Sequence, residues 1–373
     1  MGKLSLRRRL ALEIDRKRRH MLNEEHPLTQ LFWECTQRCN LNCRHCGSDC
    51  KTSSVAPDMP AGDFLKAIDS ILPHVDRHRL NIVITGGEPL VRRDLEDVGL
   101  ELYRRELPWG IVSNGLLLTP RRFDSLRRAG IHNLTISLDG DEDDHNWLRG
   151  NPESYRRAIS AIKMAAAADD LNFDVVTCVN RRTIGKLPGI AARLEEAGVR
   201  NWRLFTIFPS GRARQYPEFS LTADEFVALM EYIKAKRLAG GIRPSYCCEG
   251  FLGDYEGDVR SHFFRCTAGV TTGSILIDGS IAACPSIRAN YTQGNIYADD
   301  FWDVWQNRYR QYRDHSWMKT GICADCDMFR YCEGNGFHLR EEDGSIKHCY
   351  YHTALDRENS ADRGKNHNVN KNY

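Results

Sequence analysis

Three cysteines with the spacing CxxxCxxC, Cys39, Cys43 and Cys46, are the residues in this chain best suited to chemistry. Three thiolates on one loop can bind three irons of a 4Fe–4S cluster and leave the fourth iron open to a substrate or cofactor. A zinc site is the alternative for the same thiols, although structural zinc usually takes paired CxxC arms. Cys35 and Cys50 flank the loop outside this spacing, and we expect them to serve packing.

A second motif, TGGEP at 85–89, follows the next apolar run of the sequence. Gly86 and Gly87 let the backbone pass close to a ligand, and the neighbouring carboxylate of Glu88 could hold an ammonium group. Taken alone, GGEP is also an ordinary turn. The order of the two motifs is therefore more informative than either motif by itself.

A CxxxCxxC loop followed one strand later by GGEP resembles the radical SAM superfamily. The resemblance implies that the open iron chelates the amino and carboxylate groups of S-adenosylmethionine (SAM). It also implies that Gly86, Gly87, Glu88 and Pro89 contact the methionine amino group. The activity implied is reductive cleavage of SAM to a 5'-deoxyadenosyl radical, which abstracts a hydrogen atom from a substrate.

Further segments match the same family in order along the chain: SNG at 113–115, SLDG at 137–140, HNWLRG at 145–150, Asn180 and FPSGRA at 208–213. Asn, Ser and Asp are also common turn formers, so each match alone has an ordinary structural explanation. His45 stands where many family members carry an aromatic residue against adenine, although a solvent-facing histidine is an equal alternative. The SAM contacts implied are Ser113, Asn114, Ser137, Asp139, Arg149, Asn180 and His45.

The C-terminal cysteines resemble the SPASM domain, which binds auxiliary iron–sulfur clusters. Cys323, Cys326, Cys332 and Cys349 form a complete four-thiolate set for auxiliary cluster II. The first auxiliary cluster is less complete, because Gly336 stands where the family has a further cysteine. Its implied ligands are Cys266 and Cys284, with the adjacent pair Cys247 and Cys248 as the source of the missing thiolates. A zinc ribbon is the alternative for the CxxC pair, and Cys178 is expected to be buried and inert.

The resemblance favours the peptide- or protein-modifying branch of the family. Pro285 follows Cys284 where the sulfatase-maturing enzymes carry Asp, which disfavours formylglycine formation. The segment HPLTQLFWECTQRCNLNCRHCGSDC is similar to a SPASM subgroup encoded beside small bacterial lipoproteins, so a co-encoded lipoprotein precursor is a candidate substrate. Flavodoxin or ferredoxin is the electron donor implied. The alternatives are a radical SAM enzyme acting on a small molecule and a non-catalytic metal-binding interaction protein.

The motifs lie far apart in the sequence and need a fold that brings their loops together. The hydrophobic pattern predicts such a fold. Short apolar runs alternate with amphipathic stretches from residue 30 to 237, which is typical of parallel βα units. Unusual residues that follow strands meet at the carboxyl end of such a barrel. The predicted strands are 31–35, 80–85, 111–113, 134–138, 173–179 and 202–207. The predicted helices are 61–72, 93–105, 120–129, 152–168, 184–197 and 222–237.

We therefore predict an α/β fold, a partial (β/α)6 barrel followed by a small Cys-rich SPASM-like module. The predicted segments are a basic helical start at 1–29, the radical SAM barrel at 30–237, the SPASM-like module at 238–352 and a polar, disordered tail at 353–373. FWDVWQNRYRQYR is expected to be the one long helix of the module. The long chain excludes a small disulfide scaffold.

Composition narrows the function classes. The 373 residues carry 52 Lys and Arg against 50 Asp and Glu, a formal net charge of +2, which does not indicate a nucleic-acid partner. No apolar run approaches the roughly 18 residues of a transmembrane helix. The 14 cysteines and a basic start without an apolar signal segment favour a reducing cytoplasm.

Overall fold

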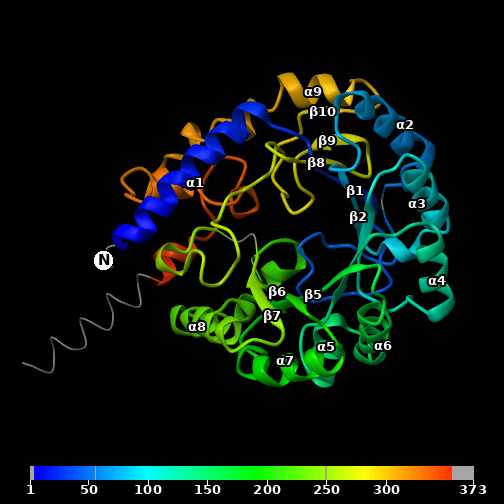
Figure 1. The fold of residues 1–373 in the computed structure, drawn as a ribbon, viewed down its shortest axis with the longest axis horizontal. Coiled ribbons are helices and arrows are strands. Elements are labelled where there is room, and N and C mark those ends of the chain that lie inside the picture. Colours follow the sequence, from blue (N-terminus) through cyan, green and yellow to red (C-terminus); the bar gives the residue numbers. More distant parts are fainter. Residues whose placement is uncertain (1–3, 55, 208, 248–249, 355–373) are drawn as a thin grey trace, which may run out of the picture.

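One curved sheet organises the protein, and the computed structural model describes residues 4–54, 56–207, 209–247 and 250–354 (Figure 1). The strand order is β10-β9-β8-β1-β2-β3-β4-β5-β6-β7. All pairings from β8 through β1 to β7 are parallel, and β9 and β10 pair antiparallel at one edge. The strands are β1 Gln30–Thr36, β2 Asn81–Gly86, β3 Trp109–Ser113, β4 Asn133–Ser137, β5 Asn172–Val179, β6 Asn201–Thr206, β7 Arg243–Tyr246, β8 Thr272–Ile275, β9 Ser280–Ala282 and β10 Gly294–Asn295.

Helices follow the parallel strands and cover the outer face of the sheet, as the arc of α3 to α8 in Figure 1 shows. The helices are α1 Leu6–Glu25, α2 Ala61–Ile71, α3 Leu95–Arg104, α4 Pro120–Arg128, α5 Glu142–Arg149, α6 Ser154–Ala166, α7 Leu187–Glu196, α8 Ala223–Ala239, α9 Phe301–Asn307, α10 Arg310–Arg313 and α11 Phe329–Cys332. The predicted α/β class with a parallel sheet is confirmed. Helix α5 was not predicted, because its eight residues are mostly polar.

Local sequence explains where several helices begin. Thr119 accepts a hydrogen bond from the Arg122 backbone at the start of α4, and Pro120 occupies the first turn. Thr222 and Glu225 form a capping box at the start of α8. These caps satisfy backbone N–H groups that the first helical turn leaves without partners. They fix the lengths of the connections between strands and helices.

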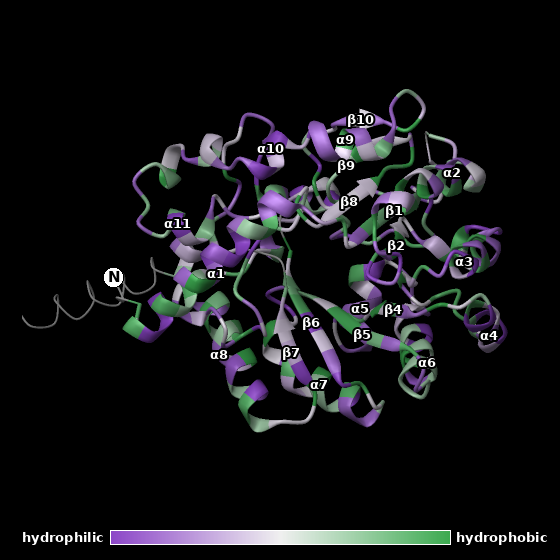
Figure 2. Ribbon diagram, turned by 45° about the horizontal axis from the view of Figure 1, so that its top comes forward, coloured by the Kyte–Doolittle hydropathy of each residue, from purple (hydrophilic) through white to green (hydrophobic). Residues whose placement is uncertain are grey.

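The core lies between the sheet and the outer helices. Trp33, Trp109 and Trp202 come from three different parallel strands, and all three are fully buried. Trp33 stacks on Phe64 of α2, with ring centroids 4.2 Å apart. The apolar stretches of these strands are visible as green bands inside the ring of helices in Figure 2.

The C-terminal region adds strands to the same sheet. The six strands predicted between residues 30 and 237 are present as β1 to β6, and two strands outside that range extend the parallel sheet, because β7 joins β6 and β8 joins β1. Their four-residue segments RPSY and TGSI contain Pro or Gly and carry little apolar signal. Strands on both sides of residues 237 and 238 thus belong to one sheet, and the domain boundary there stays a prediction.

The single long helix predicted for FWDVWQNRYRQYR is wrong. It is divided into α9 and α10, and α9 ends at Asn307. The guanidinium of Arg313 donates to the backbone carbonyls of Trp305 and Gln306, which satisfies the last turn of α9. The break turns Tyr309 into the core, where its hydroxyl donates to the carbonyl of Ala282.

The first and last parts of the chain lie against the C-terminal region. Helix α1 buries Leu12 and Arg19 against it, and Tyr331 donates a hydrogen bond to Glu13. Residues 350–354 are helical, and residues 355–373 of the predicted tail lie outside the described part of the chain. None of the helices in the described part combines the length and apolar composition needed to cross a bilayer.

Candidate active site

A cavity of about 310 Å³ opens at the carboxyl ends of the parallel strands. In a βα barrel, loops that follow the strands build the active site at this end. Residues that follow β9 close part of the cavity, so both halves of the chain contribute to it. The lining consists of Glu34, His45, Cys46, Gly47, Ser48, Thr85, Gly86, Ser137, Arg149, Cys178, Phe205, Thr206, Ile207, Pro285, Ser286 and Arg288.

The loop that carries Cys39, Cys43 and Cys46 is fixed mainly through its backbone. The Cys39 N–H donates to Lys51 O at 2.7 Å. Arg212 donates from Nε to Cys43 O at 2.8 Å, and its backbone N–H donates to Cys46 O at 3.0 Å. These bonds fix the path of the loop without using the three thiols.

Gly211 allows the segment that contains Arg212 to approach the cysteine loop closely. A Cβ atom there would lie 2.5 Å from the carbonyl oxygens of Cys46 and Gly47, and its φ of +54° favours glycine. The FPSGRA segment at 208–213 therefore holds the cysteine loop through Gly211 and Arg212. The sequence flagged this segment without its role, and Phe208 lies outside the described residues.

The three thiols differ in their ease of deprotonation. Burial, with a smaller contribution from the neighbouring charges of Glu88, Cys43 and Cys46, raises the pKa of Cys39 to about 12. A hydrogen bond from the thiol of Cys50 lowers the pKa of Cys46 to about 5. The interpretation of Cys50 as a packing residue is therefore incomplete, because its thiol contacts Cys46. Cys35, in contrast, is fully buried in the core.

The GGEP turn lies against the cysteine loop with no room for side chains. A Cβ atom at Gly86 would lie 2.1 Å from Thr36 O, and one at Gly87 would lie 2.2 Å from Arg38 O. The Gly87 N–H donates to Thr36 O at 2.7 Å. The two glycines thus bring the loops after β1 and β2 into backbone contact.

The Glu88 carboxylate is buried and binds the loop that follows β3. It accepts hydrogen bonds from Ser113 Oγ at 2.8 Å, from the Asn114 N–H at 2.8 Å and from the Leu90 N–H at 3.1 Å. Burial raises its pKa, and these hydrogen bonds act against that rise. Asn114 extends the chain of contacts, because its Nδ2 donates to Asn40 Oδ1 at 2.8 Å beside the cysteine loop.

A buried ion pair joins the loop after β4 to helix α5. Asp139 Oδ2 accepts from Arg149 Nε at 2.7 Å and lies 2.6 Å from Arg149 Nη2. Burial alone would raise the pKa of Asp139, but the positive charges of Arg149 and its histidine neighbours lower it to about 2. Arg149 Nη1 also lies 3.9 Å from Cys43 Sγ. A fixed positive charge therefore stands beside the cysteine loop and faces the cavity.

Two buried histidines flank this pair. The ring of His145 accepts from the Asp139 N–H and contacts Ser154 Oγ at 2.9 Å, and burial lowers its pKa to about 3. Burial lowers the pKa of His45 to about 4, and the Nδ1 of His45 has no hydrogen-bond partner in the described structure. His45 lines the cavity, so this orphaned nitrogen fits a site that receives a polar ligand.

The expectation that Cys178 is buried and inert is wrong. Cys178 is partly exposed and lines the cavity. Its sulfur lies within 4.8 Å of ligand atoms of His45 and Asp139. Strand β5 ends at Val179, so an inward residue near its carboxyl end faces the site. The apolar neighbours of Cys178 in the sequence concealed this position.

The remaining predicted SAM residues fall into two groups. His45, Gly86, Ser137 and Arg149 line the cavity together with Cys46. Asn180 does not, because its side chain accepts from the Arg182 N–H and forms a turn. The other predicted residues lie behind the wall as supports, namely Gly87, Glu88, Pro89, Ser113, Asn114 and Asp139.

Four C-terminal cysteines surround a second, much smaller cavity. Cys323, Cys326, Cys332 and Cys349 line a space of about 20 Å³. Burial and the proximity of the other three thiols raise the pKa of Cys332. The structure brings together the four residues assigned by resemblance to auxiliary cluster II.

The residues assigned to the first auxiliary cluster are less completely placed. Cys266 and Cys284 both lie near Tyr312, whose pKa burial raises with a further contribution from the two thiols. Cys247 is buried at the end of β7, and its N–H donates to Leu204 O. Cys248 lies outside the described residues. Next to Gly336, Asn335 is buried with a φ of +75°.

Comparison with protein families identifies both halves of the chain. Residues 33–187 match the model of the radical SAM superfamily, and residues 266–327 match SPASM, an iron–sulfur cluster-binding domain. The chain carries a radical SAM region followed by a SPASM region. Its cofactors are a 4Fe–4S cluster with SAM in the first domain and auxiliary iron–sulfur clusters in the second.

Two sequence relatives and one solved structure are similar to this chain. An AdoMet-dependent heme synthase of Methanosarcina barkeri is 26% identical over 336 residues, covering 84% of this chain and 94% of the synthase. The mycofactocin maturase MftC of Mycobacterium ulcerans is 28% identical over 310 residues, covering 82% of this chain and 81% of MftC. Streptococcus suis SuiB, solved with its precursor peptide SuiA, has a TM-score of 0.67 and 17% identity over 85% of this chain and 75% of SuiB.

The geometry of the site fits these cofactors. The Cys39, Cys43 and Cys46 loop offers three soft ligands next to a cavity that contains a cationic and an orphaned polar group, Arg149 and His45. Soft thiolates are the usual ligands of iron–sulfur clusters. We assign the radical SAM cluster to these three cysteines as a proposal, and the carboxylate of SAM to Arg149.

Proposed function

We propose that this radical SAM/SPASM enzyme modifies a ribosomally made peptide or small protein. SAM at the cluster supplies a 5'-deoxyadenosyl radical, and the residues of this chain orient SAM and present one substrate residue to it. The observation that carries the proposal is the size of the cavity. At about 310 Å³ it lies at the lower end of the range of about 300 to 1,000 Å³ that ligand pockets occupy, and SAM has to share it with the substrate.

The shared cavity favours a substrate that inserts one side chain and leaves the rest of its chain outside. A heme-type macrocycle is a large rigid disc and would need the space that SAM takes. The cavity is partly open to the surface, and the segment that contains Pro285, Ser286 and Arg288 forms part of its wall. This segment belongs to the C-terminal region, so a peptide would enter between the two halves of the chain.

Arg288 holds this entrance in place. Its Nη1 lies 3.3 Å from Glu34 Oε1, and its Nη2 bonds Ser48 Oγ in the loop that follows the cysteines. Glu34 is 2% exposed, and its other oxygen lies 3.5 Å from the Ile277 N–H. We infer that Arg288 sets the position of the C-terminal segment over the substrate.

Among the relatives, MftC carries the peptide interpretation, because a mycofactocin maturase acts in the maturation of mycofactocin. The heme synthases support the second candidate function, oxidation of a small molecule, at similar identity. The missing cysteine at Gly336 also leaves room for this candidate. A cytoplasmic location, a lipoprotein precursor as substrate and a flavodoxin or ferredoxin as reductant belong to the proposal as expectations.

The test presents both substrate classes to anaerobically reconstituted, reduced enzyme with SAM. The peptide arm uses the small open reading frames that neighbour the gene, and the other arm uses iron-coproporphyrin. Loss of two hydrogens from a peptide, or an unchanged peptide mass in H2O together with uptake of deuterium in D2O, supports peptide modification. Conversion of the porphyrin with every peptide unchanged contradicts it.

Arg288→Gln sharpens the same test. We expect a higher KM for the peptide with SAM cleavage in the absence of peptide unchanged. Arg308→Gln is the matched control, because Arg308 forms a half-exposed ion pair with Asp299 far from the cavity lining. Equal KM values for the two variants would contradict the role of Arg288.

A further inference from the structure

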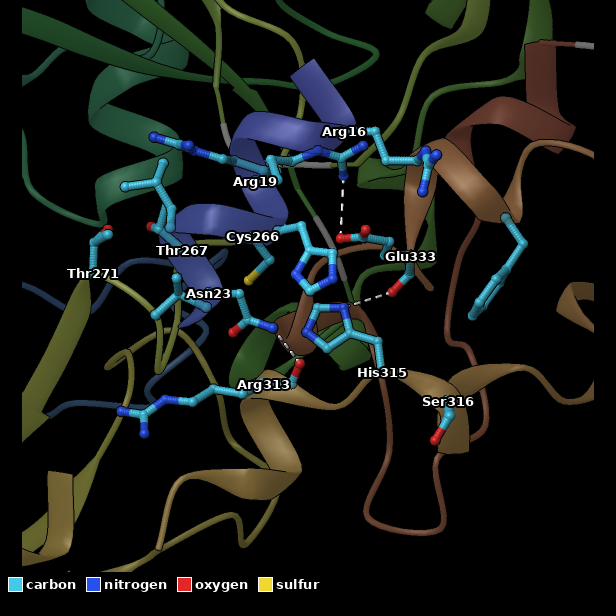
Figure 3. A pocket seen from close by; sticks show the side chains of 15 residues that line it. Arg16, Arg19, Asn23, Cys266, Thr267, Thr271, Arg313, His315, Ser316 and Glu333 are labelled. Carbon is cyan, nitrogen blue, oxygen red and sulfur yellow. Dashed lines mark hydrogen bonds and ion pairs between the residues drawn. The ribbon is translucent and has the colours of Figure 1, made fainter. Parts of the chain in front are cut away.

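We infer that the protein has a second ligand site, which binds the phosphate group of a small molecule between helix α1 and the C-terminal region. A cavity of about 290 Å³ lies there (Figure 3). Its walls come from α1, from residues 265–271 and from segments around residues 313–316 and 329–333. It shares no lining residue with the cavity at the carboxyl ends of the strands.

The two cavities lie toward opposite ends of the parallel sheet. Residues 265–271 precede β8, and Thr271 O accepts backbone hydrogen bonds from Thr29 and Gln30 at the amino end of β1. The active-site loops follow the strands at their carboxyl ends. A ligand in the second cavity would therefore not compete with SAM or with the substrate.

Positive charge dominates the lining. Arg16, Arg19, Arg265 and Arg313 face the cavity, and Glu333 is the one carboxylate among its described lining residues. Arg313 is fully engaged, because its guanidinium donates to three backbone carbonyls, those of Gly269, Trp305 and Gln306. Arg16 is partly engaged, because its Nε donates to Glu13 Oε2 at 3.0 Å, which leaves its two terminal nitrogens for an anion. Arg19 and Arg265 are the other two guanidinium groups to consider.

Arg19 is the strongest candidate. Its side chain is 5% exposed, its Nη1 donates to Glu333 Oε2 at 3.2 Å, and its Nε lies 3.1 Å from Asp15 Oδ2. Its Nη2 is buried without a hydrogen-bond partner in the described structure. A buried donor of this kind carries an energetic cost unless a ligand or water satisfies it. Both carboxylates near Arg19 are already paired with it, so they do not cancel the remaining cations.

Arg265 supplies a second unused cation. Its guanidinium makes no hydrogen bond or ion pair with any described residue. It is partly buried, and the positive charges of Arg18 and Arg19 lie close to it. A guanidinium held in such surroundings gains stability from a bound anion, and planar guanidinium groups bind phosphate oxygens in pairs.

His315 also lines the cavity. Its Nδ1 lies 2.9 Å from Glu333 O and its Nε2 lies 2.7 Å from Tyr312 O. Two backbone carbonyls therefore hold the ring in place at the edge of the cavity. Figure 3 shows this ring and the Arg19–Glu333 pair on facing parts of the lining. The concentration of cations favours a doubly charged phosphate over a single carboxylate.

The cavity is not the cradle of an auxiliary cluster. Cys266 contributes the single thiol among the described lining residues, whereas a 4Fe–4S cluster is held by four cysteine thiolates. Its volume exceeds what a lone phosphate needs, and Leu22, Val270 and Phe329 give part of the wall an apolar character. These residues fit the organic part of a phosphate ester.

The experiment titrates inorganic phosphate into the full-length, cluster-loaded protein by isothermal calorimetry, with ionic strength held constant by KCl. We expect saturable binding that Arg265→Gln and Arg16→Gln each weaken ~10- to 100-fold, the loss of one charge-assisted hydrogen bond. Arg18→Gln is the matched control, because Arg18 is exposed on the same helix and does not line the cavity. Its affinity should equal that of the unmodified protein.

Absence of saturable phosphate binding would overturn the proposal. Equal weakening by Arg18→Gln and Arg265→Gln would also overturn it, because the effect would then come from the overall charge of α1. Iron content measured for each variant separates a lost site from a misfolded C-terminal region. Arg16→Gln keeps the test decisive if Arg265→Gln fails to load iron, since Arg16 is partly exposed on α1 and distant in sequence from every predicted ligand.

Discussion

The two best-defined sets of cysteines differ in what surrounds their thiols. Cys39, Cys43 and Cys46 lie on one loop beside a cavity of about 310 Å³, with the guanidinium of Arg149 facing the same space. The four C-terminal thiols enclose about 20 Å³, lined in part by Phe251, Met328, Phe329 and Tyr351. Three ligands beside open space leave an iron position for chemistry, and four ligands in a closed apolar shell leave none.

The difference predicts distinct tasks for the two sets. The open set would bind SAM, and the closed set would transfer electrons. Arg340 supports this view of the closed set, because its buried Nη2 lies 3.5 Å from Cys323 Sγ and would offset negative charge on a cluster. The following predictions test whether the two sets have separate tasks and how strongly the buried residues behind the open set contribute to stability.

The largest effect is expected from removing one thiol of the open set. Cys43→Ala should abolish production of 5'-deoxyadenosine, because two thiolates do not hold the cluster. Cys35→Ala is the matched control, since Cys35 is buried in the core a few residues earlier, and it should retain the activity. Mass spectrometry of reduced reaction mixtures measures both. Loss of activity in the two variants alike would mean that folding rather than ligation is responsible.

Removing one thiol of the closed set should have a different result. We expect Cys332→Ala to lower the iron content of the protein while SAM cleavage without substrate continues. Substrate modification should stop, because the electron from the substrate would have no acceptor. Iron and sulfide analysis beside 5'-deoxyadenosine measurement checks this. Complete loss of SAM cleavage would show that the open set depends on the closed set and would contradict their separate tasks.

The buried ion pair behind the open set is expected to contribute strongly to stability. Asp139→Asn leaves the buried guanidinium of Arg149 without its counter-charge and should lower the free energy of unfolding by about 3–5 kcal/mol. Asp170→Asn breaks the exposed pair with Arg127 and should cost less than about 1 kcal/mol. Urea unfolding of the two variants under reducing conditions measures the difference. Equal costs would show that the pair is not a support of the site.

A smaller effect is expected from acid. The pKa of His145 is about 3 in the folded protein against 6.5 for an unperturbed histidine, so below pH 6.5 the unfolded chain binds a proton that the folded chain does not. This stability is present above pH 6.5 and is lost as the pH falls. The contribution of His145 between pH 6.5 and pH 5 is about 2 kcal/mol.

His145→Asn should reduce the loss of stability over this range by that amount. Urea unfolding at pH 6.5 and pH 5 measures it. The exposed His132 provides the matched control, and His132→Asn should leave the pH dependence unchanged. An unchanged pH dependence in His145→Asn would contradict the assignment of His145 as a buried neutral ring.

Much of the fold was predictable because the parallel strands appear in the sequence as short apolar runs that alternate with amphipathic stretches. The six predicted strands correspond to β1 through β6, and α2, α4 and α8 begin within a residue of the predicted positions. The short strands β7 and β8 gave no such signal, because their pairing with β6 and β1 depends on contacts distant in sequence. Helix α5 was missed for a different reason, because its polar composition gives no apolar periodicity.

The site was predictable where residue type alone decides the chemistry. Spacing picked out the three cysteines, and Gly86 is needed because a side chain would collide with Thr36. The contacts of Cys178 and Cys50 could not be predicted. Tertiary packing determines which way the side chain of Cys178 points at the end of β5, and it also determines the path of the loop that contains Cys50. The anchoring role of Arg212 is of the same kind, as it connects segments that lie about 170 residues apart.

The most direct test of the account is SAM cleavage by the anaerobically reconstituted, reduced protein, compared with a variant in which Cys39, Cys43 and Cys46 are all replaced by Ala. The account predicts 5'-deoxyadenosine from the unmodified protein and none from the variant, while the variant keeps the iron bound at Cys323, Cys326, Cys332 and Cys349. Cleavage that persists in the variant, or its absence from fully iron-loaded protein with every candidate substrate present, would contradict the assignment of this loop as the catalytic centre.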